Sequence, residues 1–189
     1  MTHWALDETE GDFAVDSAGE NDAFAMGGPV WQSDAGQVDG AIELDGIDDV
    51  LIAASPLNPA NGPFSVFAWV KGGAPGQAII SEPAGPDWLS LDPLTGCVMT
   101  ELTSTGRNAT ALISQAVIDD ESWHRIGLVW DGSHRTLYVD GVVVADDIQP
   151  GLQGSQMGLY IGTGKDMEPG TYFSGLIDDV RIYNRVVSP

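Results

Sequence analysis

The stretch WHRIGLVWDGSHRTLYVDGVVVADD, residues 123–147, contains three runs of strand-forming residues separated by Asp131-Gly132 and Asp140-Gly141. Valine, isoleucine and aromatic residues favour strands, and Asp-Gly favours tight turns whose backbone needs positive φ. In the middle run, Leu137 and Val139 alternate with Tyr138 and Asp140, so the predicted strand has one buried and one solvent-exposed side. The stretch therefore predicts a meander of three antiparallel strands.

The rest of the chain has the same character. Short apolar runs alternate with turn formers such as NPANGP and KGGAPG, and the 189 residues include 24 glycines and 11 prolines. No window shows a sustained helical period. We predict an all-β domain over residues 1–189, built as a sandwich of two antiparallel sheets.

The segment FSVFAWVKG, residues 64–72, is apolar on both sides of the predicted strand. One side carries Phe64 and Val66, and the other carries Phe67 and Trp69. Such a strand either lies centrally in a sheet covered on both faces or lines a ligand-binding concavity. Periodicity leaves both possibilities open.

The net charge of the chain limits the classes of partner that we expect it to bind. Twenty-eight acidic residues face seven basic ones, for a formal net charge of −21. Nucleic acids and anionic membrane surfaces require a basic surface, so we expect neither as a partner. No run of about 18 apolar residues predicts a membrane-spanning helix. The opening residues MTHWALDETEGD lack the pattern of a signal peptide, and the single cysteine, Cys97, precludes an intramolecular disulfide.

Five motifs resemble, in order and spacing, a laminin-G-like domain of the concanavalin A-like lectin/glucanase superfamily. The motifs are GAIELDGIDDVLIA, PFSVFAWVKG, ESWHRIGLVWDGSHRTLYVDGVVVA, LYIG and YFSGLIDDVRIYNRVVS. The opening WALDETEGDFAVDSAGENDAF is also similar to the family's first strand and loop. The resemblance implies a jelly-roll sandwich of two curved antiparallel sheets.

Catalysis is not expected. Glucanases of the same superfamily carry the pattern Glu-x-Asp-x-x-Glu on one strand, and the nearest match here runs from Glu43 to Asp48. It lacks the last glutamate, and Gly46 is expected to turn the chain within it. The chain contains no serine-hydrolase, zinc-protease or phosphate-binding motif.

The last predicted strand contains two adjacent carboxylates, Asp178 and Asp179. Strand alternation predicts that Asp179 lies on the side of Ile177 and that one carboxylate meets an apolar layer, where it needs a cation or several donors. The resemblance implies a structural calcium ion here, with Asp178 as the matching aspartate and Gly46 as the matching glycine. The first strand would contribute near Asp7. Asp16, in the VDSAG loop, is the alternative, and the competing explanation is an Asp178 that only accepts backbone N–H bonds.

The predicted function is that of a non-catalytic binding module for a polysaccharide or glycoconjugate, stabilised by calcium. Trp88, Trp31 and Tyr160 are the candidate aromatic platforms for a sugar. The alternative is a structural or protein-interaction domain of a surface assembly or virion, with other protein domains as partners. Either reading predicts an extracellular or cell-surface location as part of a larger protein.

Overall fold

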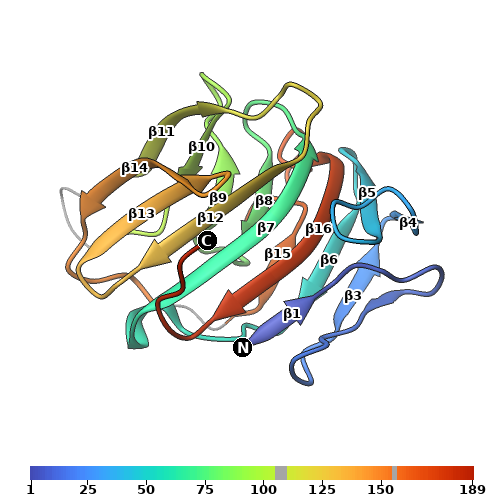
Figure 1. Ribbon diagram of the computed structural model, residues 1–189, viewed down its shortest axis with the longest axis horizontal. Coiled ribbons are helices and arrows are strands. Elements are labelled where there is room, and N and C mark those ends of the chain that lie inside the picture. Colours follow the sequence, from blue (N-terminus) through green and yellow to red (C-terminus); the bar gives the residue numbers. More distant parts are fainter. Residues whose placement is uncertain (105–109, 155–156) are drawn as a thin grey trace.

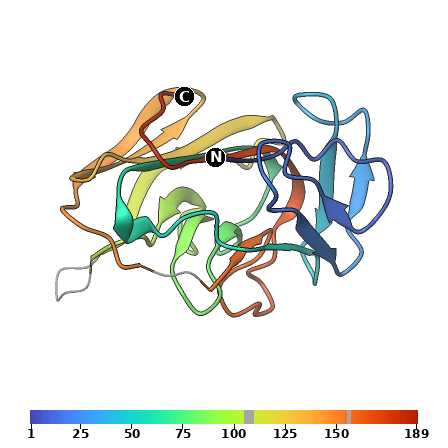
Figure 2. The same ribbon diagram turned by 90° about the horizontal axis from the view of Figure 1, so that it is seen from below.

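The computed structural model describes residues 1–104, 110–154 and 157–189. Two antiparallel sheets pack face to face, as Figures 1 and 2 show. The only helical element in these ranges is one short turn of 3-10 helix, η1 (Pro59–Asn61). Within the same ranges no helix is long and apolar enough to cross a membrane. The predicted all-β sandwich is confirmed, and its two sheets are those of a jelly roll.

The front sheet lies nearest the viewer in Figure 1. Its strand order is β14-β13-β12-β7-β16-β5-β4, and β1 also pairs with β16. Its strands are β1 (Thr2–Trp4), β4 (Val30–Gln32), β5 (Ala41–Asp45), β7 (Phe64–Gly72), β12 (His124–Trp130), β13 (His134–Val139), β14 (Val142–Ile148) and β16 (Ser174–Tyr183). The predicted meander is therefore confirmed as β12, β13 and β14, and it forms one side of this sheet.

The back sheet has the order β11-β10-β9-β8-β15-β6-β3-β2. Its strands are β2 (Phe13–Ala14), β3 (Ala23–Met26), β6 (Val50–Ala53), β8 (Ala78–Ser81), β9 (Asp87–Leu91), β10 (Cys97–Thr100), β11 (Leu112–Val117) and β15 (Leu159–Ile161). Consecutive strands often fall in different sheets, so segments distant in sequence become neighbours.

The core lies between the sheets, and β7 shows how the front sheet divides its side chains. Phe64, Val66, Ala68 and Val70 belong to the buried core. By alternation, Ser65, Phe67, Trp69 and Lys71 lie on the opposite side, which we call the outer face of the front sheet. Trp69 is half-buried there. The second apolar side of this strand thus faces away from the core.

A β-bulge interrupts β16 beside β7. Asp178 pairs with Trp69, whereas Arg181 pairs with Phe67, so β16 has one extra residue between them. Val180 and Ile182 are buried in the core. The prediction that Asp179 lies on the side of Ile177 is wrong, because the bulge shifts the alternation. The Asp179 carboxylate instead pairs with His3 and Arg181 on the outer side.

Candidate functional site

Asp178 lies at a junction of three segments that are far apart in sequence. Its side chain is fully buried. One carboxylate oxygen, Oδ2, accepts hydrogen bonds from the backbone N–H groups of Gln37 and Val38, each at 2.8 Å. The other oxygen, Oδ1, is buried and has no hydrogen-bond partner among the described residues. A buried carboxylate oxygen without a donor is costly unless a cation or water meets it.

The electrostatics of the junction follow from this burial. Burial raises the pKa of Asp178 to about 7; the N–H groups of Val38 and Gln37 oppose the rise, and the charges of Asp179 and Asp7 add to it. The nearby side chains of Arg181 and His3 do not contact Asp178, because both pair with Asp179. The junction thus holds a buried carboxyl oxygen that has neither a hydrogen-bond donor nor an ion-pair partner among the described residues.

The structure brings Asp7 to this junction and leaves Gly46 away from it. The Asp7 carboxylate accepts the N–H of Gly40 at 2.7 Å, immediately before β5. Gly46 follows the other end of β5, where its nearest neighbour is Ser174. Gly40, rather than the predicted Gly46, is therefore the glycine that lies at this junction. The register of β5 on β16 decides the matter, since Asp45 pairs with Ser174 and the start of β5 reaches Asp178.

Asp16, the alternative first-strand ligand, has its own partners. Its carboxylate accepts N–H bonds from His3 at 2.9 Å, Ala18 at 3.0 Å and Asn21 at 3.3 Å. Burial acts to raise the pKa of Asp16, but these N–H groups together outweigh it and lower the pKa. Both oxygens of Asp16 therefore accept hydrogen bonds and stabilise its loop, whereas one oxygen of Asp178 has no donor among the described residues.

Backbone conformation marks the same junction. Leu6, Asp39 and Asp179 all have positive φ, at 64°, 61° and 50°. Non-glycine residues rarely adopt this conformation, and they hold it only where the surrounding structure fixes it. Three segments are thus held in unusual conformations around one buried carboxylate.

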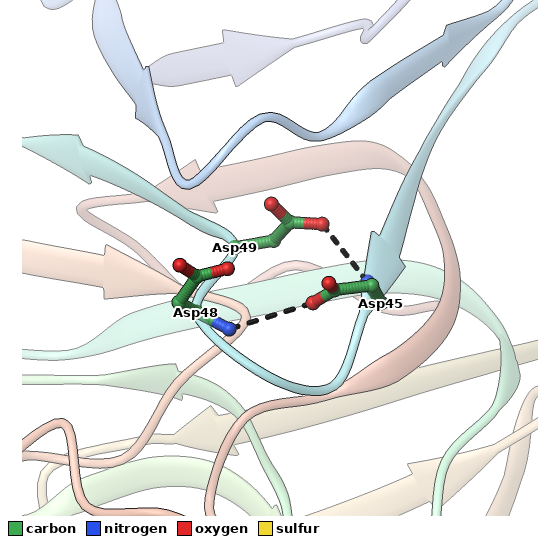
Figure 3. Close-up of side chains that lie close together, drawn as sticks. All are labelled: Asp45, Asp48 and Asp49. Atoms are coloured by element: carbon green, nitrogen blue, oxygen red, sulfur yellow. Dashed lines mark hydrogen bonds between the residues drawn. The ribbon is translucent and has the colours of Figure 1, made fainter.

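A second group of carboxylates lies at the other end of β5. Asp45, Asp48 and Asp49 place one oxygen each within 4.8 Å of one another, as Figure 3 shows. Asp49 accepts the N–H of Asp45 at 2.9 Å, and Asp45 accepts the N–H of Ile47 at 2.8 Å. Asp45 and Asp48 are exposed. These hydrogen bonds stabilise the turn between β5 and β6, so the three carboxylates have a structural role that does not need an ion.

The half-buried residue Asp87 begins β9 and also carries a buried carboxylate oxygen. Its Oδ1 has no hydrogen-bond partner among the described residues, and Glu101 forms an ion pair with Lys165 at 2.9 Å nearby. Burial raises the pKa of Asp87 to about 6; the charge of Glu101 adds to the rise and that of Lys165 opposes it. Here the chain itself supplies a cation.

The aromatic residues predicted to bind sugar lie apart from one another. Trp88 is fully buried, and its ring packs 5.4 Å from that of Phe64 in the core. Its prediction as an exposed platform is wrong, because β9 begins at Asp87 and carries Trp88 inward. Trp31, on β4, packs against the core and donates its indole N–H to the carbonyl of Gly11. Tyr160 is half-buried on β15 of the back sheet.

Sequence reasoning did not single out the aromatic residues of the outer face as ligand contacts. Trp69 on β7 and Tyr138 on β13 are half-buried there. Phe67 lies between them, and its ring fills the space over Gly127 of β12, where an added Cβ would approach it to 2.3 Å. The only signal in the sequence was the two-sided apolar pattern of residues 64–72.

Comparisons with known proteins fit this geometry. The laminin-G-like family model described as the concanavalin A-like lectin/glucanases superfamily matches residues 44–189. Domain 4 of AbnA, an extracellular arabinanase from Geobacillus stearothermophilus solved with arabinotriose, superposes with a TM-score of 0.75 and 18% identity, covering 100% of this chain and 93% of that one. None of the curated proteins compared with the chain matches it significantly.

Two toxin domains share the fold as well. The binding domain of Paraclostridial Mosquitocidal Protein 1 has a TM-score of 0.75 at 14% identity, covering 94% of this chain and 48% of that one. The ligand-binding domain of botulinum neurotoxin serotype D, solved with N-acetylneuraminic acid, has a TM-score of 0.72 at 15% identity, covering 100% and 48%. The chain thus spans about half the length of these toxin domains.

Proposed function

Because the chain belongs to the concanavalin A-like lectin/glucanase superfamily, we propose that it is a non-catalytic module that binds carbohydrate through the outer face of its front sheet. The observation that carries the proposal is the half-buried pair Trp69 and Tyr138 on a sheet face directed away from the core. Aromatic rings offer flat apolar surfaces, and neighbouring polar groups can orient a bound ring by hydrogen bonds.

Two structural neighbours support a glycan as the ligand. One was solved with arabinotriose and belongs to an extracellular arabinanase, and the other was solved with N-acetylneuraminic acid. By this analogy, the module works outside the cell or at its surface, attached to a partner that carries the catalytic or adhesive function.

A binding role rather than hydrolysis agrees with the arrangement of the Glu43–Asp48 segment. A retaining glycosidase needs two free carboxylates about 5–5.5 Å apart across one bond. Here Glu43 contacts the side chain of Gln32, and Asp45 serves the turn after β5. The segment lacks the strand-borne set of acids that the superfamily's glucanases use.

The proposal includes a structural calcium ion at Asp178. The buried, unpartnered Oδ1 of Asp178 and the carboxylate of Asp7 fit a hard cation, which prefers carboxylate and carbonyl oxygens. Asp178 and Asp7 would hold the ion, and backbone carbonyls of the same junction would complete its shell. The ion would supply charge compensation, linking the first segment, the loop before β5 and the last strand.

Calorimetric titration with a panel of defined oligosaccharides tests the binding function. We expect binding that Trp69→Ala weakens about fivefold or more, because a lost aromatic contact costs about 1 kcal/mol or more. Tyr160→Ala is the matched control on the back sheet and should leave the affinity unchanged. No binding to any member of the panel in the presence of calcium would overturn the proposal, and loss of binding in Tyr160→Ala alone would move the site to the back sheet.

A further inference from the structure

The basic side chains of this acidic protein are not spread evenly. Six of the seven lysines and arginines lie in the described part of the chain; Arg107 lies outside it. Two of the six, Arg135 and Lys165, lie away from the outer face, and each forms an ion pair with a carboxylate. The other four gather on the outer face of the front sheet: Lys71, Arg125, Arg181 and Arg185.

Three of these four cations have no carboxylate partner. Arg181 pairs with Asp179, but no ion pair within 4.0 Å involves Lys71, Arg125 or Arg185 among the described residues. This is unexpected in a chain with 28 acidic residues. The acids of this face have other partners. Glu43 accepts from Gln32 at one edge, and Asp178, which is paired with Trp69, accepts the N–H groups of Gln37 and Val38. Asp179 pairs with His3 and Arg181, and Asp140 contacts His124 and the backbone N–H of Arg125, so none of these carboxylates forms an ion pair with the side chain of Lys71, Arg125 or Arg185.

Aromatic rings, rather than acids, accompany the two unpaired arginines. The guanidinium of Arg125 lies 4.9 Å from the centroid of the Phe67 ring, and that of Arg185 lies 5.6 Å from the Tyr183 ring. A guanidinium over a ring is oriented by the ring while its N–H edge stays available. Such an edge matches a carboxylate, which it can bind through two parallel hydrogen bonds.

The cross-strand register places these groups around the proposed platform. Arg125 is directly opposite Trp69, and Tyr183 is opposite Ser65 on the same side of the sheet. The segment after β16 lies over the same face, because Ser65 Oγ donates to the carbonyl of Arg185 at 3.0 Å; Figure 1 shows the C terminus in front of β7 and β12. Strands β12 and β16 flank β7, so Arg125 and Arg181 are separated by about 10 Å across the sheet. Arg185 follows β16 and lies beside Ser65, farther along β7 from Trp69.

From this arrangement we propose that the outer face selects a glycan bearing carboxylate groups, a polyuronate, with Arg125 and Arg185 each contacting a sugar carboxylate and Lys71 adding positive charge at one end. The inference rests on the proposed carbohydrate function and specifies its substrate class. A neutral glycan would leave the unpaired cations unused. The net charge of −21 opposes an anionic polymer at long range, so the selection acts through contacts at this face and needs ordinary salt to screen the rest of the surface.

Calorimetry with oligogalacturonate of fixed length, at 0.15 M or higher salt and with calcium present, tests the inference against the same oligomer with its carboxyl groups reduced to alcohols. We expect the acidic oligomer to bind at least about tenfold more tightly than the reduced one, since a charge-assisted hydrogen bond exceeds a neutral one by this order. Arg125→Gln and Arg185→Gln should each lower the affinity for the acidic oligomer about tenfold and leave the reduced oligomer unaffected.

Lys165→Gln is the matched control, because it removes the same unit charge away from the outer face. Lys71→Gln provides a second test that does not disturb the packing of an arginine on a ring, and the melting temperature of each variant establishes that it is folded. Equal affinity for the acidic and reduced oligomers, or full affinity in both arginine variants, overturns the inference while leaving carbohydrate binding intact. If neutral and acidic glycans both fail to bind, the proposed function fails with it.

Discussion

The two ends of β5 carry similar groups of acids and differ in what those acids need. At the far end, Asp45, Asp48 and Asp49 crowd together, yet two are exposed and the group accepts backbone N–H bonds of its own turn. At the near end Asp178 lies close to Asp179 and Asp7, and one of its oxygens is buried without a donor among the described residues. On the proposal of a structural calcium ion, the comparison teaches that an oxygen lacking a partner, rather than the number of acids, marks the place a cation would occupy.

Removing the cation tests this contrast with the largest expected effect. If the proposed ion is bound, we expect EDTA to lower the melting temperature of the protein by about 5–11 °C. An ion bound only by the folded state contributes about 2.7 kcal/mol at 100-fold excess over Kd, and each kcal/mol corresponds to about 2–4 °C. Excess Ca²⁺ should restore the melting temperature better than Mg²⁺, which demands stricter octahedral geometry. Scanning calorimetry with each metal measures the shift.

Two variants assign that shift to one end of β5. Asp178→Ala should abolish the difference between EDTA and calcium, whereas Asp45→Ala should preserve it. The opposite pattern would place the ion at the turn after β5 and reverse the comparison. Identical melting of the wild type in both conditions, with no metal found by elemental analysis, would remove the ion altogether.

The fold was predictable because its signals are local. Alternation in residues 134–139 and the flanking Asp-Gly pairs specify strands and turns without reference to distant residues. The junction was harder, because Asp39-Gly40 and Asp45-Gly46 are the same dipeptide at the two ends of one strand. Only the register of β5 on β16 tells which glycine approaches Asp178. The bulge that redirects Asp179 and the inward direction of Trp88 likewise depend on pairing between strands.

Substituting the two glycines sharpens the comparison at an intermediate scale. Gly46 has a φ of +78°, and an added Cβ would lie 2.8 Å from Ser174 Cβ; an added Cβ on Gly40 would lie 2.9 Å from Asp7 Cα. Each alanine should therefore destabilise the protein by about 1–2 kcal/mol. Gly40→Ala should also reduce the calcium-dependent shift in melting temperature, and Gly46→Ala should retain it. A retained shift in Gly40→Ala with a lost shift in Gly46→Ala would restore the original assignment.

The smallest effect on stability is expected at Asp87, where the side chain of Lys165 offers the positive charge that we propose calcium offers at Asp178. Its folded pKa, about 6, exceeds the ordinary value of 3.8 through burial, with Glu101 adding to the rise. The folded state therefore binds this proton more tightly than the unfolded state, so the contribution to stability is present below about pH 4 and is lost as the pH rises through about 6. Asp87→Asn should stabilise the protein by about 1 kcal/mol at pH 8, an advantage that shrinks toward pH 4. Urea unfolding at constant calcium measures the difference, and carboxyl NMR of Lys165→Gln should show a further rise in the pKa of Asp87 because its positive neighbour is gone. A pKa of Asp87 at or below 3.8 in the wild type, or a calcium-dependent shift in melting temperature lost in Asp87→Asn, would contradict this distinction. The distinction is between Asp87, whose charge Lys165 partly offsets, and Asp178, where we propose a calcium ion.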